Sequence, residues 1–239
     1  QAGTPSQREG RFELWYKAKH TASAQAASYG LVPFAMPVGS GGALIANPGC
    51  YATAALMAIV PLLKAGVISP KSLVIDAKSG TTGAGRKASE AQLFSEVDGE
   101  CLPYKIAQHQ HLPEIREWAE AFSGVEIDPF FSTHLLPVRR GILASIYAEL
   151  VPGADVAAAF EAVYRGYPLV RVTNLDAKEE QALSPALSLS LKRVVGTART
   201  HISFRVAEGK LYLFSIIDNL LKGAASQAVE NFNSLHDLP

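Results

Sequence analysis

The sequence predicts an α+β fold: a mixed, largely antiparallel sheet with helices on one face. The first observation is that runs of β-branched and aromatic residues recur at short intervals from Pro129 onward. The second is that turn signals such as Glu208-Gly209 separate these runs, which favours hairpin neighbours. The third is that a few amphipathic helical segments fall between them, enough to cover one side of such a sheet.

Length and composition are those of a globular protein. The 239 residues leave room for one large domain or one and a half, and the 48% apolar content excludes a disordered chain. The formal net charge is +0, so we expect neither a nucleic-acid footprint nor a membrane-surface patch. No apolar run reaches the roughly 18 residues of a membrane span. Two cysteines suit a reducing compartment, so we expect a cytoplasmic protein.

The first quarter of the chain alternates helical and extended segments. Residues 13–29 are rich in alanine and aromatic residues and predict one or two short helices. A short strand at residues 44–46 leads into a helix that begins at Cys50. Pro61 would kink this helix, and Gly66 would cap its end.

The remaining elements follow from periodicity and composition. Helices are expected where apolar residues recur on one face, at residues 113–123, 154–164 and 220–235. Strands are expected at the runs of β-formers, residues 72–77, 130–136, 142–151, 169–172, 189–195, 201–207 and 211–217.

Cys50 stands where a helix start would activate a thiol. The turn signal Pro48-Gly49 precedes it, and uncharged helix formers follow it. The free N–H groups and the positive dipole end of a helix lower a thiol pKa, and the thiolate is the nucleophile. We therefore expect iodoacetamide to modify Cys50 far faster than Cys101, which lies in a loop. The alternative is that Cys50 is a small buried hydrophobic residue, the commoner fate of a lone cysteine.

A glycine-rich loop supplies a candidate anion site. Gly80, Gly83 and Gly85 would let backbone N–H groups approach an anion closely. Arg86 follows them and could clamp a phosphate or carboxylate. The glycine spacing is not that of a dinucleotide fingerprint. A flexible turn and a solvated arginine are therefore the alternatives.

His109 and His111 are expected in the loop just before the helix at residues 113–123. Their H-x-H spacing could serve a metal, but no cluster of further ligands accompanies them, so no metal is expected. One imidazole that titrates near the working pH is enough for general acid–base catalysis.

Five segments of the chain follow one another in an order that a known family shares. They are N-P-G-C-Y-A-T at residues 47–53, S-G-T-T-G-A-G-R-K-A at 79–88, H-Q-H-L-P-E-I at 109–115, H-L-L-P-V-R-R-G-I at 134–142 and I-D-N-L-L-K-G-A-A-S-Q-A-V-E-N at 217–231. Together they resemble N-acetyl-gamma-glutamyl-phosphate reductase, the arginine-biosynthesis enzyme. The resemblance extends from about Glu13 to near the end of the chain.

The resemblance implies an NADPH-dependent reduction of an acyl phosphate to an aldehyde. It also implies the fold of the C-terminal domain of glyceraldehyde-3-phosphate dehydrogenase and a homo-oligomer, a dimer or tetramer. Cys50 would displace phosphate and hold the acyl group as a thioester. His111 is the first choice for the acid–base group and His109 the second, because motif order alone does not separate them.

The resemblance also implies binding residues. Arg86 and Arg140 are candidates for the phosphate or carboxylate of the substrate. Gly83, Gly85 and Asn219 would lie near the nicotinamide end of the NADP(H) cofactor.

The sequence departs from the family at its beginning, because it has no G-x-G-x-x-G turn of a nucleotide-binding domain. We expect residues 1–43 to be a residual segment that borders a missing cofactor domain. Residues 44–218 would be the catalytic and dimerisation domain, and residues 219–239 a helix that packs on the cofactor domain. Since the main NADP(H)-binding domain is absent, the chain alone should bind NADPH weakly.

Three other functions remain open. One is an aminoadipyl-phosphate reductase of lysine biosynthesis, which an assay with each acyl phosphate would separate. The second is a Cys-His hydrolase, which would turn over esters or amides without NADPH. The third is a non-catalytic subunit of the same fold, inactive even when a cofactor domain is supplied.

Overall fold

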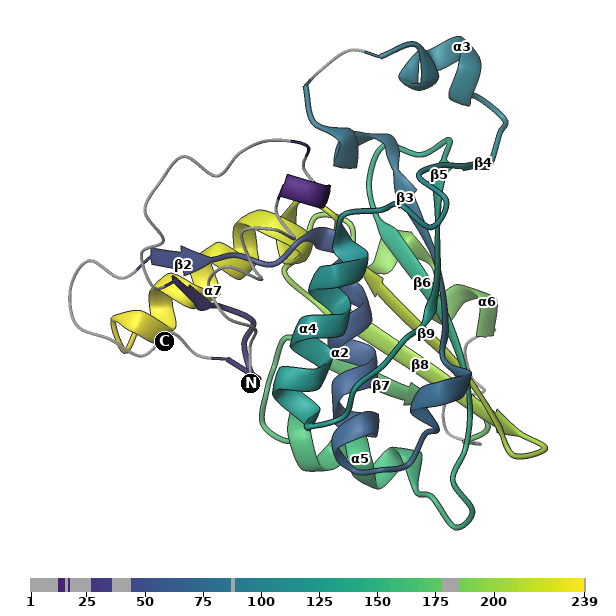
Figure 1. The fold of residues 1–239 in the computed structure, drawn as a ribbon, viewed down its shortest axis with the longest axis vertical. Coiled ribbons are helices and arrows are strands. Elements are labelled where there is room, and N and C mark those ends of the chain that lie inside the picture. The colour runs from purple at the N-terminus through teal and green to yellow at the C-terminus, as the bar shows by residue number, and fades with distance from the viewer. Residues whose placement is uncertain are drawn as a thin grey trace.

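The structure of the protein, a computed structural model, describes residues 13–15, 17, 27–35, 44–86, 89–177 and 185–238. A seven-stranded sheet organises this part of the chain, in the order β4-β5-β3-β6-β9-β8-β7 (Figure 1). Its strands are β3 (Val74–Gly80), β4 (Leu102–Pro103), β5 (Phe130–Leu136), β6 (Ile142–Glu149), β7 (Val170–Asn174), β8 (Thr200–Ala207) and β9 (Lys210–Ile217).

The strand pairing confirms the predicted fold class. β3 runs parallel to β5 and β7 to β8, whereas the other four neighbouring pairs are antiparallel. The predicted hairpin turn joins β8 to β9, and Glu208 and Gly209 have φ angles of 51° and 72°. A two-residue turn with both φ angles positive matches the twist of the flanking strands.

Three helices cover one face of the sheet: α2 (Cys50–Lys64), α4 (His111–Ser123) and α5 (Val156–Tyr164) (Figure 1). Every residue of α2 from Tyr51 to Leu63 is buried, because the helix packs against the sheet on one side and against α4 and α5 on the others. The predicted helix start at Cys50 is confirmed. Pro61 lies inside the helix, and Gly66 follows its end with a φ of 66°.

The opposite face of the sheet carries aromatic and polar side chains. Tyr147 of β6 and Tyr212 of β9 stand side by side there, with ring centroids 5.9 Å apart and exposed fractions of 36% and 38%. On β3 the carboxylate of Asp76 pairs with Lys78 and accepts the hydroxyl of Ser132 at 2.7 Å. This half-covered surface is called the open sheet face below.

A small group of elements lies beside the sheet. β1 (Ala27–Tyr29) pairs in parallel with β2 (Leu44–Ala46), and α7 (Ser226–Leu235) lies against them (Figure 1). Asn231 of α7 donates hydrogen bonds to the carbonyl of Gly30 at 2.9 Å and to Asn47 Oδ1 at 3.1 Å. The C-terminal helix is therefore held next to the turn that begins α2. The predicted three-part division of the chain stays a prediction.

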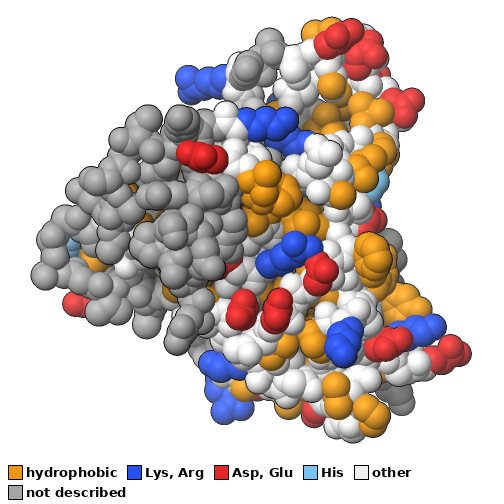
Figure 2. Space-filling model, in the orientation of Figure 1, with side chains coloured by type: hydrophobic (Ala, Val, Ile, Leu, Met, Phe, Trp, Pro, Cys, Tyr) orange, Lys and Arg blue, Asp and Glu red, His pale blue; other side chains and the backbone are white. Residues whose placement is uncertain are grey.

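Short helical segments connect these elements. They are η1 (Pro70–Ser72), η2 (Thr81–Ala84), η3 (Glu90–Gln92), α3 (Phe94–Val97), α6 (Pro185–Ser188), η5 (Leu191–Arg193) and the π-helical η6 (Leu221–Ala225). None of the helices in the described ranges is both long and apolar enough to cross a membrane. Figure 2 shows basic and acidic side chains interspersed over this side of the molecule, in keeping with the zero net charge.

Three predicted elements differ in part or in full from the structure. Within residues 13–29 the described part is helical at residues 13–15, but residues 27–29 are strand β1, because they pair with β2. Residues 189–195 form η5 and a turn, although they are rich in β-formers, since Arg193 and Val194 donate backbone hydrogen bonds to nearby carbonyls in place of a strand ladder. The predicted helix at residues 220–235 is helical, but its first part is the π-helical segment η6.

Candidate active site

A cleft of about 720 Å³ opens where the starts of α2 and α4 meet the loop after β3 and the η6 turn. Five of the predicted site residues line it: Cys50, His109, His111, Gly83 and Asn219. Segments far apart in the sequence therefore converge on one cavity.

Local geometry places Cys50 at the first position of α2. Gly49 is the extended residue before the helix, and its carbonyl accepts the N–H of Thr53 at 2.8 Å. Gly223 of η6 packs directly on the cysteine, since a Cβ at that glycine would lie 2.7 Å from Cys50 Cβ. The thiol is thus held between the helix start and the η6 turn.

The prediction that the helix start lowers the Cys50 pKa is wrong. Burial of the thiol, with a smaller effect from the Glu114 carboxylate, raises the pKa of Cys50 to about 11. The backbone N–H groups at the helix start act in the opposite direction but do not prevail. Cys101 is exposed, and the predicted order of iodoacetamide reactivity stays a prediction. Cys50 is a protonated thiol at neutral pH that needs a base.

Two imidazoles line the same cleft as this thiol. His111 is the first residue of α4, not part of the loop before it, so that prediction is corrected. Its backbone N–H donates to His109 Nδ1 at 3.2 Å, and the ring centroids are 4.7 Å apart. The His111 ring packs against Gly49, where a Cβ would overlap it. The His111 ring therefore lies against the turn that carries Cys50.

Both imidazoles are neutral at pH 7. Burial, followed by the charges of His111 and Lys105, lowers the pKa of His109 to about 3. Burial and Lys105 lower the pKa of His111 to about 4. The Nδ1 atom of His111 is buried and has no hydrogen-bond partner among the described residues. A neutral ring with an uncommitted nitrogen can accept a proton.

Glu114 is a site residue that sequence reasoning missed. Its carboxylate accepts the N–H of Gly49 and the hydroxyl of Tyr29, each at 2.8 Å, and its burial raises its pKa. It lies three residues after His111, so both side chains leave α4 on the same face. That spacing is the signal that could have identified it.

The glycine-rich loop forms η2 and is tied down by Asn219. The Asn219 amide donates to Thr82 Oγ1 at 3.1 Å, and its oxygen accepts the N–H of Gly141 at 2.8 Å. Gly83 lines the cleft, and a Cβ there would lie 3.1 Å from Ser79 Oγ. Gly85 has a φ of 79° and is a turn glycine outside the residues that line the cleft.

Neither predicted arginine lines the cleft. Arg86 is exposed beyond it. Arg140 pairs with Asp218 at 3.3 Å, and this fully buried carboxylate also accepts backbone N–H groups from η6 and from Gly196. Their proposed contact with substrate stays a prediction. Among the described residues, Lys105 is the lysine or arginine that lines the cleft, and the sequence did not distinguish it from an ordinary loop lysine.

No group of three histidine, cysteine, aspartate or glutamate side chains comes together within the described ranges in a way that could hold a metal.

The described cleft brings a thiol at a helix start and two neutral imidazoles together beside a mixed α+β sheet, the residue types of a cysteine–histidine site. The profile of the family described as "Semialdehyde dehydrogenase, dimerisation domain" matches residues 50–219. The chain belongs to this family.

Curated relatives bear out the resemblance seen in the sequence. The N-acetyl-gamma-glutamyl-phosphate reductase of Moorella thermoacetica is 39% identical over 235 residues, which cover 95% of this chain and 65% of that one. The enzyme of the same name from Geobacillus kaustophilus is 40% identical over 93% of this chain and 64% of its own length. The chain thus spans less than two thirds of these relatives.

Solved structures agree on the fold. Aspartate semialdehyde dehydrogenase II from Vibrio cholerae superimposes with a TM-score of 0.58 over 80% of this chain and 61% of its own, at 15% identity. The aspartate semialdehyde dehydrogenase of Francisella tularensis gives a TM-score of 0.59, also at 15% identity, over 81% of this chain and 65% of its own.

Proposed function

We propose that this chain is the catalytic and dimerisation portion of an NADP-dependent N-acetyl-gamma-glutamyl-phosphate reductase. The reaction would reduce N-acetyl-gamma-glutamyl phosphate to N-acetylglutamate semialdehyde in arginine biosynthesis. The observation that carries this proposal is the placement of Cys50 and His111 on one cleft, with the His111 ring against the glycine that precedes the thiol.

The first chemical step is acyl transfer to Cys50. The sulfur attacks the carbonyl carbon of the acyl phosphate, a C–S bond forms, and the C–O bond to phosphate breaks. Inorganic phosphate leaves with the bonding electron pair. His111 takes the thiol proton, because its imidazole is neutral at pH 7 while the thiol is not ionised.

The same residues then hold and return a proton. The thioester keeps the acyl group at the start of α2, shielded by η6 and Gly223. When the C–S bond later breaks, the departing sulfur needs a proton, and the His111 imidazolium can give it back. His109 supports the backbone that carries this ring, since its Nδ1 accepts the backbone N–H of His111.

A bound nicotinamide cofactor would supply the hydride for this reduction. One wall of the cleft is formed by Gly83, Gly223 and Asn219. Because two of these residues are glycines, no side chain there obstructs a flat ring. The described ranges contain no glycine-rich strand–turn–helix unit for the pyrophosphate. Tight NADP(H) binding is therefore assigned to a domain outside this chain.

Assembly is part of the proposal. A sheet face with partly exposed tyrosines beside polar groups can be buried by a second copy of itself. The open sheet face is therefore the surface through which two protomers would form a dimer.

The test uses a fusion protein, in which this chain is joined to the part of the Moorella thermoacetica relative that it does not cover. NADPH oxidation with N-acetyl-gamma-glutamyl phosphate is followed, and Cys50→Ser is expected to abolish it. Preference for an aminoadipyl phosphate would overturn the substrate. Ester hydrolysis without NADPH, or no activity in a folded fusion, would overturn the reductase.

A further inference from the structure

The described side chains that line the cleft include a positive charge but no carboxylate. Among the described residues that line it, Lys105 carries the one permanent charge, and no aspartate or glutamate joins it there. Within the described part of the chain, its ammonium group makes a hydrogen bond to Gln110 Oε1 at 2.6 Å and no ion pair. A cation beside a cavity without a counter-charge favours an anionic ligand.

The backbone that carries this exposed lysine is held in place. Tyr104, the residue before it, is anchored twice: its N–H donates to the carbonyl of Thr133 at 3.0 Å, and its hydroxyl donates to that of Tyr51 at 2.9 Å. Lys105 and Ala107 have φ angles of 46° and 56°. Non-glycine residues adopt such angles at an energetic cost, so the surrounding contacts must hold this shape.

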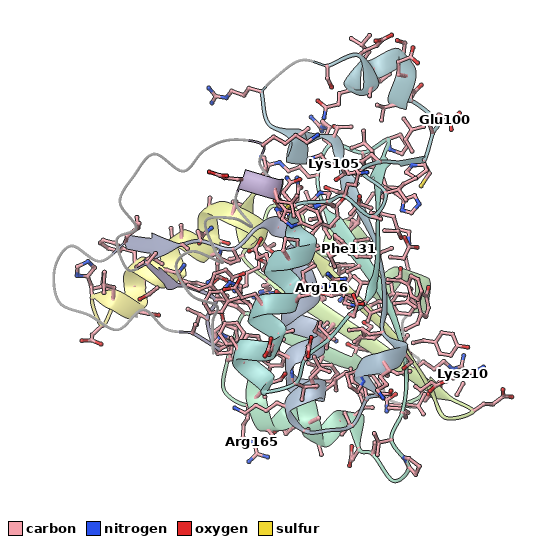
Figure 3. All side chains as sticks on the ribbon, in the orientation of Figure 1. Glu100, Lys105, Arg116, Phe131, Arg165 and Lys210 are labelled. Carbon is pink, nitrogen blue, oxygen red and sulfur yellow. The ribbon has the colours of Figure 1, made fainter. Side chains whose placement is uncertain are left out.

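Lys105 lies within electrostatic reach of the reacting groups. Figure 3 shows it beside the start of α4, the end of the helix that bears His111. Its positive charge lowers the pKa of both His109 and His111. The ammonium group, the imidazoles and Cys50 therefore act on the same volume of the cleft.

We propose that Lys105, held by Gln110, binds the phosphoryl group of the acyl-phosphate substrate and the phosphate that leaves it. This inference rests on the proposed acyl-phosphate reaction. A lysine ammonium is a point charge suited to a phosphoryl group that turns and departs during the reaction. The charge that builds on the leaving oxygen as the C–O bond breaks is stabilised by the ammonium.

The bound dianion has a second effect on the site. It offsets the positive charge that disfavours protonation of His109 and His111, so the imidazole pKa values rise when the anion arrives. His111 then becomes a better base for the Cys50 proton at the moment when an acyl phosphate is bound. Binding of the phosphoryl group and activation of the thiol are thus coupled through Lys105.

The experiment uses the chain as it stands, with ¹³C-labelled histidine, in an NMR titration with inorganic phosphate at constant ionic strength. The variants are Lys105→Gln, Lys105→Arg and, as a matched control, Lys210→Gln, which removes an exposed lysine at the far end of the molecule (Figure 3). Phosphate should shift the His109 and His111 signals and raise their pKa values in the parent chain and in Lys210→Gln. Lys105→Gln should weaken phosphate binding about 10-fold or more, and Lys105→Arg should retain most of it.

Equal phosphate affinity in Lys105→Gln and the parent chain would overturn the inference. So would tighter binding of acetate than of phosphate, which would assign Lys105 to the carboxylate of the substrate. A separate arm measures acetylation of Cys50 by acetyl phosphate, using intact mass and a Cys101→Ser background. Absence of acetylation in the parent chain counts against the proposed function, whereas the histidine signals report on the phosphate site alone.

Discussion

The carboxylate of Glu114 on α4 accepts the backbone N–H of Gly49, the residue immediately before Cys50, at 2.8 Å. This bond ties the helix that carries His111 to the turn that carries the thiol. It also places a negative charge where it raises the Cys50 pKa. One side chain therefore helps to position the proposed nucleophile and adds to the rise in pKa that burial of the thiol causes.

Glu114→Gln keeps an oxygen for the Gly49 N–H but removes the charge. The Cys50 pKa should then fall below its value of about 11, because the thiolate no longer faces a carboxylate. Alkylation rates across pH, in a Cys101→Ser background, measure it. Glu120→Gln, an exposed position on the same helix, is the control and should leave the profile unchanged. Equal profiles for Glu114→Gln and the parent would contradict the expectation.

His111→Asn should lower the reductase rate of the fused enzyme by about 10²–10⁴-fold, the usual cost of losing a general acid–base group. His109→Asn should cost less, because His109 acts through His111. Steady-state rates with each variant measure both effects. If His109→Asn is the slower enzyme, the two roles are exchanged.

Gly223→Ala should displace the thiol. The new methyl group would lie 2.7 Å from Cys50 Cβ, which forces a shift, and 3.1 Å from its Cα, which is a tight contact. We expect a loss of about 1–3 kcal/mol in the free energy of unfolding and loss of acyl transfer. Urea denaturation and acetylation of Cys50 are the measurements. Ala225→Ser adds one atom at an exposed position of the same turn and should behave as the parent does.

Acid should destabilise the chain between about pH 6.5 and pH 4. Burial, together with neighbouring arginines, lowers the pKa of His201 to about 4, whereas an unfolded histidine titrates near 6.5. The unfolded state therefore takes up a proton first, and stability falls as the pH drops through this window. The slope is at most about 1.4 kcal/mol per pH unit for each such histidine. His201→Gln should flatten the pH dependence of urea denaturation, while His236→Gln, at an exposed position, should not.

The chain should form a dimer at micromolar concentration. Tyr147→Glu places a charge in the middle of the open sheet face, next to Tyr212, and should shift the equilibrium toward monomer. Light scattering after size exclusion measures the mass. Leu238→Glu, an exposed apolar position near the C-terminus, is the control. A monomeric parent, or a dimer that Tyr147→Glu leaves intact, would refute this interface.

Local signals in the sequence determined much of the fold. The Pro48-Gly49 turn followed by uncharged helix formers placed the start of α2 at Cys50, as observed. The run of β-formers gave the bounds of β5 (Phe130–Leu136), and Glu208-Gly209 gave the hairpin turn. These features depend on nearest neighbours along the chain, so the residues themselves carry the information. β1 was missed because a three-residue strand exists through its pairing with β2.

The tertiary structure alone decided the state of the candidate site. The sequence brought out Cys50, His109 and His111, and the fold brings all three to one cleft. The sequence did not predict the raised pKa of the thiol. Desolvation by the packed core raises this pKa more than the N–H groups at the helix start lower it. Nor did the sequence single out Glu114 or Lys105 from other charged residues. Their effects depend on distances to groups remote in sequence and on the exclusion of water, and both quantities exist only once the chain has folded.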